Sequence, residues 1–226
     1  MAKDNAYSMS QMNTARRPIR ARDTRLAAHV AAWLARVGVR PNAISLASAL
    51  FAGGAGLSLV LTGKTTGNFQ PWLFLTAAGL IQMRLLCNLF DGMVAIEGGF
   101  RTKSGEIFNE LPDRFADAFI FVGAGYAAVG LDWALAAGWL CAVLAVLTAY
   151  VRALGASAGA SQHFCGPMAK QHRMAVMTFA CIASAVLSWC GVQWPVVAGA
   201  LALIGAGSVI TVFRRAVRIV RELEGK

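Results

Sequence analysis

The sequence predicts an all-α integral membrane protein, with six transmembrane helices preceded by an N-terminal amphipathic helix at the membrane interface. Two observations lead to this fold class. Of the 226 residues, 57% are apolar and 14% are charged, whereas a soluble domain carries about 25% charged residues. The apolar residues also gather in runs that approach the roughly 20 residues an α-helix needs to cross a bilayer.

Six runs qualify as spans, at about residues 43–62, 72–95, 106–130, 133–152, 173–190 and 195–213. Pro41 fits the first turn of the first span, because that position of a helix needs no backbone donor. The third run holds Asn109, Glu110, Asp113 and Asp117, so hydropathy alone gives it too little weight. The expected organisation is a basic N-terminal segment (1–40), a six-helix transmembrane domain (41–216) and a basic cytoplasmic tail (217–226).

The N-terminal segment contains one short amphipathic pattern. Asp23 is a candidate cap for a helix from Thr24 to about Val37, and its apolar face would carry Leu26, His29, Val30, Trp33 and Leu34. A helix of this kind suits the cytoplasmic surface of a membrane.

The net charge of +10 is expected to meet anionic lipid head groups rather than nucleic acid, because the cations lie at the edges of the apolar runs. The connections after the first, third and fifth spans hold only Lys64 and Asp132 as charged residues, and the other connections are cationic. By the positive-inside rule, both termini should be cytoplasmic. The five cysteines have no metal-ligand spacing and are expected to be free thiols.

The stretch NLFDGMVAIEGGFRTKSGEIFNELPDRFAD, residues 88–117, is a polar island between two spans. Ionisable groups inside membrane segments are costly and usually functional. Asn88, Asp91 and Ala95 share one helix face by their spacing, and Asn109 and Asp113 share a face of the next helix. Two antiparallel helices would bring these carboxylates and amides together, which suits a divalent metal with oxygen ligands.

This stretch resembles the signature of the CDP-alcohol phosphotransferases, membrane enzymes of phospholipid synthesis, which reads D-x2-D-G-x2-A-R-x8-G-x3-D-x3-D. Every spacing is kept when the signature is laid on Asn88, Asp91, Gly92, Ala95, Ile96, Gly105, Asn109 and Asp113. The resemblance implies transfer of the phosphatidyl group of CDP-diacylglycerol to a small alcohol, with release of CMP and dependence on Mg²⁺ or Mn²⁺.

The resemblance also assigns roles to individual residues. Asp91 and Asp113 would be the catalytic pair, with Asp91 a metal ligand and Asp113 the base. The metal site would comprise Asn88, Asp91, Asn109 and Asp113, and the nucleotide site would comprise Asn42, Asp91, Gly92, Ala95 and Gly105.

Three positions depart from the signature, since Asn88 and Asn109 replace aspartates and Ile96 replaces an arginine. Each asparagine still offers a carbonyl oxygen but removes a negative charge. Glu110 and Asp117 are candidates to restore that charge. The alternative to an active transferase is a catalytically impaired relative that binds nucleotide or lipid without turnover.

The segments YVRA (150–153) and GPMAKQHR (166–173) resemble the subgroup whose acceptor alcohols carry a phosphate, such as glycerol 3-phosphate or inositol phosphate. Arg152, Lys170 and Arg173 would then bind the acceptor phosphate. The competing interpretation is that these cations anchor the helices at lipid head groups. The resemblance leaves a homodimer open and favours a bacterial inner membrane. A transporter is disfavoured, because the polar residues cluster at one end of two helices.

Arg84 lies one turn before Asn88, deep in the second run, and Asp117 lies at a similar depth in the third. A lone intramembrane arginine would be very costly. The sequence therefore predicts that Arg84 and Asp117 form a buried ion pair.

Overall fold

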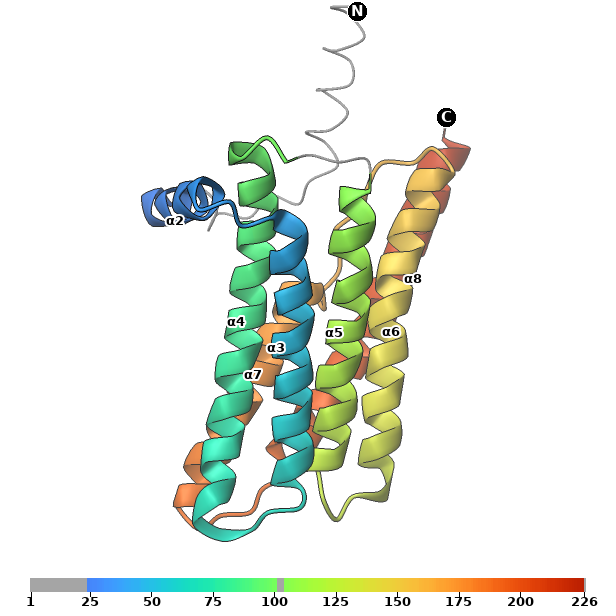
Figure 1. Cartoon of the computed structure of the whole chain (residues 1–226). Coiled ribbons are helices and arrows are strands. Elements are labelled where there is room, and N and C mark those ends of the chain that lie inside the picture. The colour runs from blue at the N-terminus through green and yellow to red at the C-terminus, as the bar shows by residue number, and fades with distance from the viewer. Residues whose placement is uncertain (1–23, 101–103, 226) are drawn as a thin grey trace, which may run out of the picture.

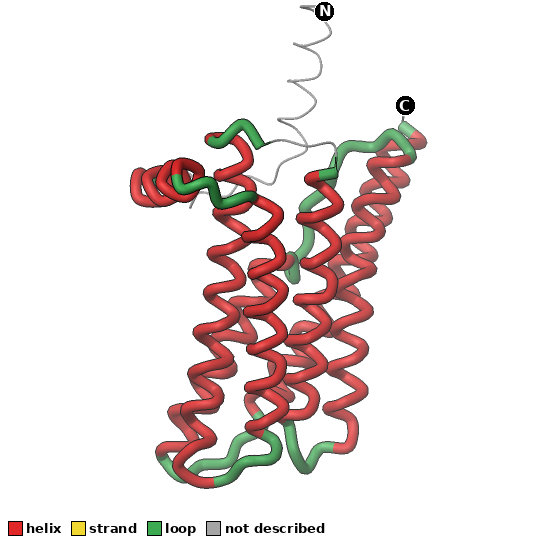
Figure 2. Tube along the Cα trace, viewed as in Figure 1, coloured by secondary structure: helices red, strands yellow, loops and turns green. Residues whose placement is uncertain are grey.

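A computed structural model describes residues 24–100 and 104–225, and every regular element in these two ranges is helical (Figures 1 and 2). Seven α-helices and one short 3-10 helix occur there: α2 (Arg25–Arg36), α3 (Pro41–Thr62), η2 (Gly67–Phe69), α4 (Gln70–Glu97), α5 (Gly105–Ala127), α6 (Asp132–Ser157), α7 (Lys170–Trp189) and α8 (Val196–Glu224). The long helices α3 to α8 form one bundle, and α2 lies across one end of it.

Five of the long helices, α3, α4, α6, α7 and α8, are long and apolar enough to cross a membrane. The chain is therefore a multi-pass membrane protein. The sixth long helix, α5, has 23 residues and packs between α3 and α6, but Asp113, Arg114 and Asp117 interrupt its apolar run. The α3–α4, α5–α6 and α7–α8 connections lie at the end of the bundle opposite α2 and the C-terminus (Figure 1).

The start of α2 differs in one detail from the expectation. Thr24 is the N-cap, and its hydroxyl accepts a hydrogen bond from the Ala27 amide at 3.4 Å. Asp23, the residue suggested by the sequence, lies outside the described residues. Ala27 and Ala31 face a small core that also contains Met93 and Val94 of α4, which holds α2 against the bundle.

The last helix is longer than the sequence suggested. The apolar run was expected to end near residue 213 and a basic tail to begin at 217, and α8 continues through both positions to Glu224. Ile219 explains the extension: it is buried and occupies the space beside Gly155 of α6, where a Cβ atom would meet its side chain. An apolar stripe among the arginines thus keeps the last turns of α8 docked.

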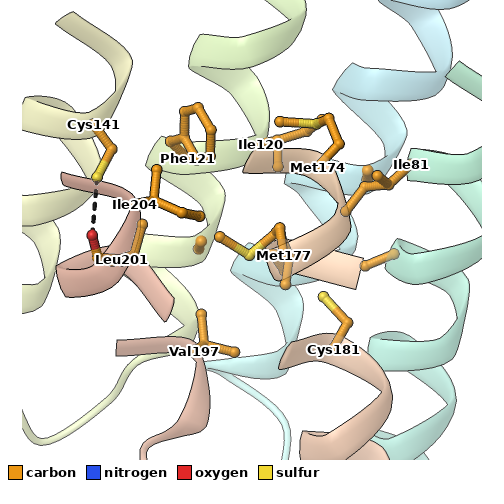
Figure 3. Close-up of a cluster of buried hydrophobic side chains, with 14 of the residues drawn as sticks. Ile81, Ile120, Phe121, Cys141, Met174, Met177, Cys181, Val197, Leu201 and Ile204 are labelled. Atoms are coloured by element: carbon orange, nitrogen blue, oxygen red, sulfur yellow. Dashed lines mark hydrogen bonds between the residues drawn. The ribbon is translucent and has the colours of Figure 1, made fainter. Parts of the chain in front are cut away.

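The apolar core fills the middle of the bundle. Ile120 and Phe121 of α5 meet Met174 and Met177 of α7, and Leu201 and Ile204 of α8 close the layer (Figure 3). Cys141 and Cys181 belong to this core as free thiols, as expected, and the Cys141 thiol donates to the Leu201 carbonyl at 3.3 Å.

The helices α3 and α5 approach so closely that only glycine fits at their crossing. A Cβ atom on Gly123 would lie 2.7 Å from the Cα atom of Gly56, well inside van der Waals contact. Small residues at such crossings allow close backbone packing, which is a main source of helix association in membranes. This contact fixes α5, which carries Asp113 and Asp117, relative to α3.

Candidate active site

Three buried carboxylates lie inside one end of the bundle. Asp91 of α4 is 3% exposed, and Asp113 and Asp117 of α5 are 7% and 1% exposed. The helices that carry them do not pack tightly on each other, because α4 and α5 flank α3 on its two sides (Figure 1). The carboxylates are therefore joined through side chains that reach across the interior.

Asp91 is held by α3 and by its own backbone. The Ser45 hydroxyl donates to Asp91 Oδ2 at 2.9 Å, and the Gly92 amide donates to Asp91 Oδ1 at 2.5 Å. Each oxygen of the carboxylate is thus held by one hydrogen bond, which fixes its orientation. Asp91 also lies close enough to Lys170 and Asp113 to interact with both electrostatically.

Asn88 lies one turn earlier on α4 and is half-buried. Its side-chain amide nitrogen donates to Ser48 Oγ at 3.2 Å and to the Arg84 carbonyl at 3.0 Å. Because the nitrogen is engaged, the carbonyl oxygen is the atom that this side chain can offer to a cation.

Ser45 and Ser48 are site residues that the sequence analysis missed. Both are buried on α3. The available signal was their three-residue spacing, which places them on one face of the first span, in line with Asn42.

Asp113 is surrounded by cations. Lys170, the first residue of α7, forms an ion pair with Asp113 Oδ2. A guanidinium nitrogen of Arg84 lies 3.7 Å from Oδ1, and one of Arg114 lies 3.9 Å from Oδ2. Three cationic side chains therefore lie within 4 Å of this one carboxylate.

Asp117 bridges two buried arginines. Arg84, which is fully buried, donates to Asp117 Oδ1 at 2.5 Å, so the predicted Arg84–Asp117 pair is confirmed. Arg173 of α7 donates to the other oxygen at 2.9 Å, a contact the sequence did not suggest. Arg173 also donates to Thr148 Oγ1 at 3.1 Å and to the Met168 carbonyl at 2.9 Å.

Arg152 lies on α6 and is partly exposed. It donates to Glu110 Oε1 at 2.7 Å and to Gln162 Oε1 at 2.8 Å, and its guanidinium lies 5.2 Å from the Phe164 ring centre. Glu110 also pairs with Arg114 at 3.1 Å. Glu110 therefore forms ion pairs with two arginines, Arg114 and Arg152.

The three cations suggested for an acceptor phosphate thus each meet an acid of α5: Arg152 with Glu110, Lys170 with Asp113, and Arg173 with Asp117. Arg173 is 2% exposed, so it lies inside the bundle and does not reach lipid head groups. Its burial argues against the anchoring interpretation for this residue.

The other suggested residues differ in their exposure. Gly92, Ala95 and Gly105 are half-buried, whereas Asn42, Asn109 and Ile96 are exposed. Within the described ranges, no group of three or more His, Cys, Asp or Glu side chains is arranged to hold a metal ion. The oxygen donors present are two carboxylates, Asp91 and Asp113, and the amide oxygen of Asn88, with Asn109 on the exposed side. Such donors fit a hard divalent cation, with less negative charge than a four-carboxylate site would supply.

No family model matches the chain. The phosphatidylinositol phosphate synthase of Mycobacteroides abscessus is 26% identical over 198 residues, covering 82% of this chain and 80% of the relative. The enzyme of the same name from Mycolicibacterium smegmatis is 29% identical over 143 residues, covering 62% and 60%. The inner membrane protein YnbA of Escherichia coli is 26% identical over 173 residues, covering 73% and 79%.

Solved structures share the architecture. The phosphatidylinositol phosphate synthase of Mycobacterium tuberculosis with CDP-DAG bound superposes with a TM-score of 0.71 at 22% identity, covering 87% of this chain and 94% of that one. The same protein in complex with manganese and citrate gives a TM-score of 0.70 at 22% identity, covering 86% and 88%. This likeness establishes the fold.

Proposed function

Since the chain belongs to the CDP-alcohol phosphotransferase family, we propose that it transfers the phosphatidyl group of CDP-diacylglycerol to an alcohol and releases CMP. One observation carries the proposal: Asp91 and Asp113, the two aspartates kept from the signature, are both buried at one end of the bundle, where Asp113 pairs with Lys170. The catalytic domain would be the transmembrane region 41–216.

The reaction requires a base for the acceptor hydroxyl and positive charge for the diphosphate. In the proposed mechanism the acceptor oxygen attacks the phosphorus that carries the diacylglycerol. The bond from that phosphorus to the CMP oxygen breaks, and Asp113 takes the hydroxyl proton. Lys170 is the natural group to hold Asp113 in place before the acceptor arrives.

The donor and a metal would be bound on the α4 side. Asp91 and Asp113, with Asn88 and Asn109 as neutral oxygen donors, would hold Mg²⁺ or Mn²⁺. The ion would supply charge neutralisation for the diphosphate. Asn42, Gly92, Ala95 and Gly105 would line the nucleotide side, where small residues permit a close approach of the backbone to the ligand.

The acceptor is proposed to carry a phosphate, as in glycerol 3-phosphate or an inositol phosphate. Support comes from Arg152, Lys170 and Arg173, which converge on α5, and from the names of the mycobacterial relatives. Arginine and lysine suit phosphate oxygens by charge and donor geometry. A phosphate would compete with Glu110 and Asp113 for these cations, so acceptor binding and release of Asp113 would be coupled.

In the membrane, α5 is proposed as a sixth span and α2 as a helix lying at the cytoplasmic surface. The polar site would then open to the cytoplasm and the inner leaflet. The name of the Escherichia coli relative supports a bacterial inner membrane, and a homodimer remains a further proposal from the sequence.

The alternative, a relative that binds without turnover, is favoured by Asn88 and Asn109, which lower the charge available to a metal. One experiment separates the two. Purified protein is incubated with CDP-diacylglycerol, Mn²⁺ or Mg²⁺, and a panel of free and phosphorylated alcohols, and CMP release is measured with Asp113→Asn as control. Acceptor-dependent release supports the transferase. Binding of CDP-diacylglycerol without CMP release supports the alternative.

A further inference from the structure

The connection between α6 and α7, residues 158–169, is fastened to α8 at three levels. Near the end of α8, Glu222 accepts hydrogen bonds from the Ser161 amide at 2.9 Å, from the Ser161 hydroxyl at 2.8 Å and from His163 Nε2 at 2.6 Å. Two turns earlier, Arg215 Nε donates to the Cys165 carbonyl at 3.0 Å. Thr211 Oγ1 then accepts from the Met168 amide at 3.1 Å.

The same connection holds Arg152 of α6. Gln162 and Phe164 contact its guanidinium, one through a hydrogen bond and the other through its ring. These two residues alternate with Ser161 and His163 along the chain. The segment 161–164 therefore lies between Glu222 and Arg152. Ser161 and His163 contact Glu222, and Gln162 and Phe164 contact Arg152.

We propose that Glu222 is a positioning residue that sets the orientation of Arg152 toward the acceptor phosphate. This inference rests on the proposed function. A carboxylate that gathers an amide, a hydroxyl and an imidazole fixes both the backbone and the side chains of the segment. Gln162 and Phe164 then hold one edge and one face of the Arg152 guanidinium. An arginine side chain that is already held in place loses less conformational freedom when it binds a phosphate.

The test compares Glu222→Gln with Glu224→Gln, a matched change of an exposed acid at the same helix end. Initial rates are measured with CDP-diacylglycerol and either inositol 1-phosphate or glycerol 3-phosphate. Glu222→Gln is expected to raise KM for the phosphorylated acceptor about tenfold, the usual effect of losing a hydrogen bond to a charged group. The kcat value and the KM for CDP-diacylglycerol should stay within about twofold of wild type. Glu224→Gln should change none of these constants.

Two further readouts separate positioning from a general loss of structure. In an Arg152→Lys background, Glu222→Gln should raise the acceptor KM by less than about a further twofold. The effects of two substitutions do not add when one residue acts through the other. The half-buried thiol of Cys165, followed by peptide mass spectrometry, should be alkylated at least about threefold faster in Glu222→Gln. If Glu222→Gln does not fold, His163→Ala provides the same comparison.

An unchanged Cys165 alkylation rate, an unchanged acceptor KM, or full additivity with Arg152→Lys would each overturn the proposal. If wild-type protein releases no CMP with either phosphorylated acceptor, the proposal that the acceptor carries a phosphate is wrong. The variants are then compared by their Kd for inositol 1-phosphate. A Kd weakened about tenfold by Glu222→Gln alone upholds the positioning role, and an equal Kd or no binding by wild type removes it.

Discussion

Arg84 and Asp117 form an ion pair in the interior of the bundle, with 2.5 Å between the guanidinium nitrogen and Asp117 Oδ1 and almost no exposure of either residue. The pair is one half of a bridge, because Arg173 holds the other carboxylate oxygen. One negative charge therefore serves two cations. The two residues of the Arg84–Asp117 pair are not equivalent, because only Asp117 has a second buried partner.

We predict that Asp117→Leu destabilises the protein more than Arg84→Leu. Losing Asp117 removes the carboxylate that contacts both buried guanidinium groups and leaves Arg84 only the more distant Asp113, at 3.7 Å. Breaking a buried pair costs about 3–5 kcal/mol. Losing Arg84 leaves Asp117 still paired with Arg173. The double variant should recover only part of the loss, because Arg173 stays without its partner. Melting in detergent measures the effect, with the exposed Asp132→Leu as control. Equal losses for the two single variants would contradict the bridge.

The comparison of sequence with structure shows which contacts a spacing can predict. The Arg84–Asp117 pair followed from depth alone, because two adjacent spans of known direction place residues at matching levels. The contact with Arg173 did not follow, because it requires knowing that α7 faces α5. The hydrogen bond from Ser45 to Asp91 was missed for the same reason, since α3 lies between the two helices that carry the acids.

The helix ends show a second limit. The helix α8 continues beyond residue 213, where the apolar run ends and the arginines begin. The burial of Ile219 against Gly155 depends on packing against α6. The hydropathy of the α8 sequence carries no information about that packing. The start of α3 was predicted well, because Pro41 fits the first turn of that helix.

We predict that Gly123→Ala destabilises the bundle, whereas Gly79→Ala does not. A Cβ atom at Gly123 would press into the backbone of Gly56, and one at Gly79 would meet nothing within 4 Å. Overpacking of this kind costs about 1–3 kcal/mol. The difference in melting temperature between the two variants isolates the effect of the crossing, because both replace a helical glycine. Equal melting temperatures would mean that α3 and α5 separate without penalty.

The topology can be tested with a native cysteine. Cys190 is exposed in the α7–α8 connection, at the end of the bundle opposite the C-terminus (Figure 1). A membrane-impermeant maleimide applied to intact cells or spheroplasts should label Cys190, with Cys190→Ser as control. A cysteine placed by Glu224→Cys in the Cys190→Ser background should be labelled only after lysis. Labelling of both sites from outside would contradict the proposed orientation.

Asp91→Asn and Asp113→Asn should each lower CMP release by at least about a thousandfold, in keeping with the loss of a central acid–base or ligand group. Neither change should unfold the protein, because each substitution keeps the shape of the side chain. Measurements of melting temperature and of CMP release on the same preparation check both halves of the prediction. Wild-type CMP release by Asp113→Asn would rule out its role as the base.

The last prediction concerns the charge that the signature has lost. Asn88 has its amide nitrogen bound to Ser48 and to the Arg84 carbonyl, so Asn88→Asp would exchange that donor for a second oxygen and add a negative charge. Asn109 is exposed, so Asn109→Asp would add a charge without losing a buried contact. Divalent ions bind more tightly as the number of carboxylate ligands rises. We therefore expect Asn109→Asp to lower the Kd for Mn²⁺, by about tenfold or more, and Asn88→Asp to lower it less, because its hydrogen bonds are lost. Titration of Mn²⁺ into metal-free protein measures both, with Asn42→Asp as a control that adds the same charge on α3. Chelation with EDTA should abolish CMP release in all of them. An equal gain from Asn42→Asp would mean that the change reflects local charge alone and that Asn109 is not at the metal.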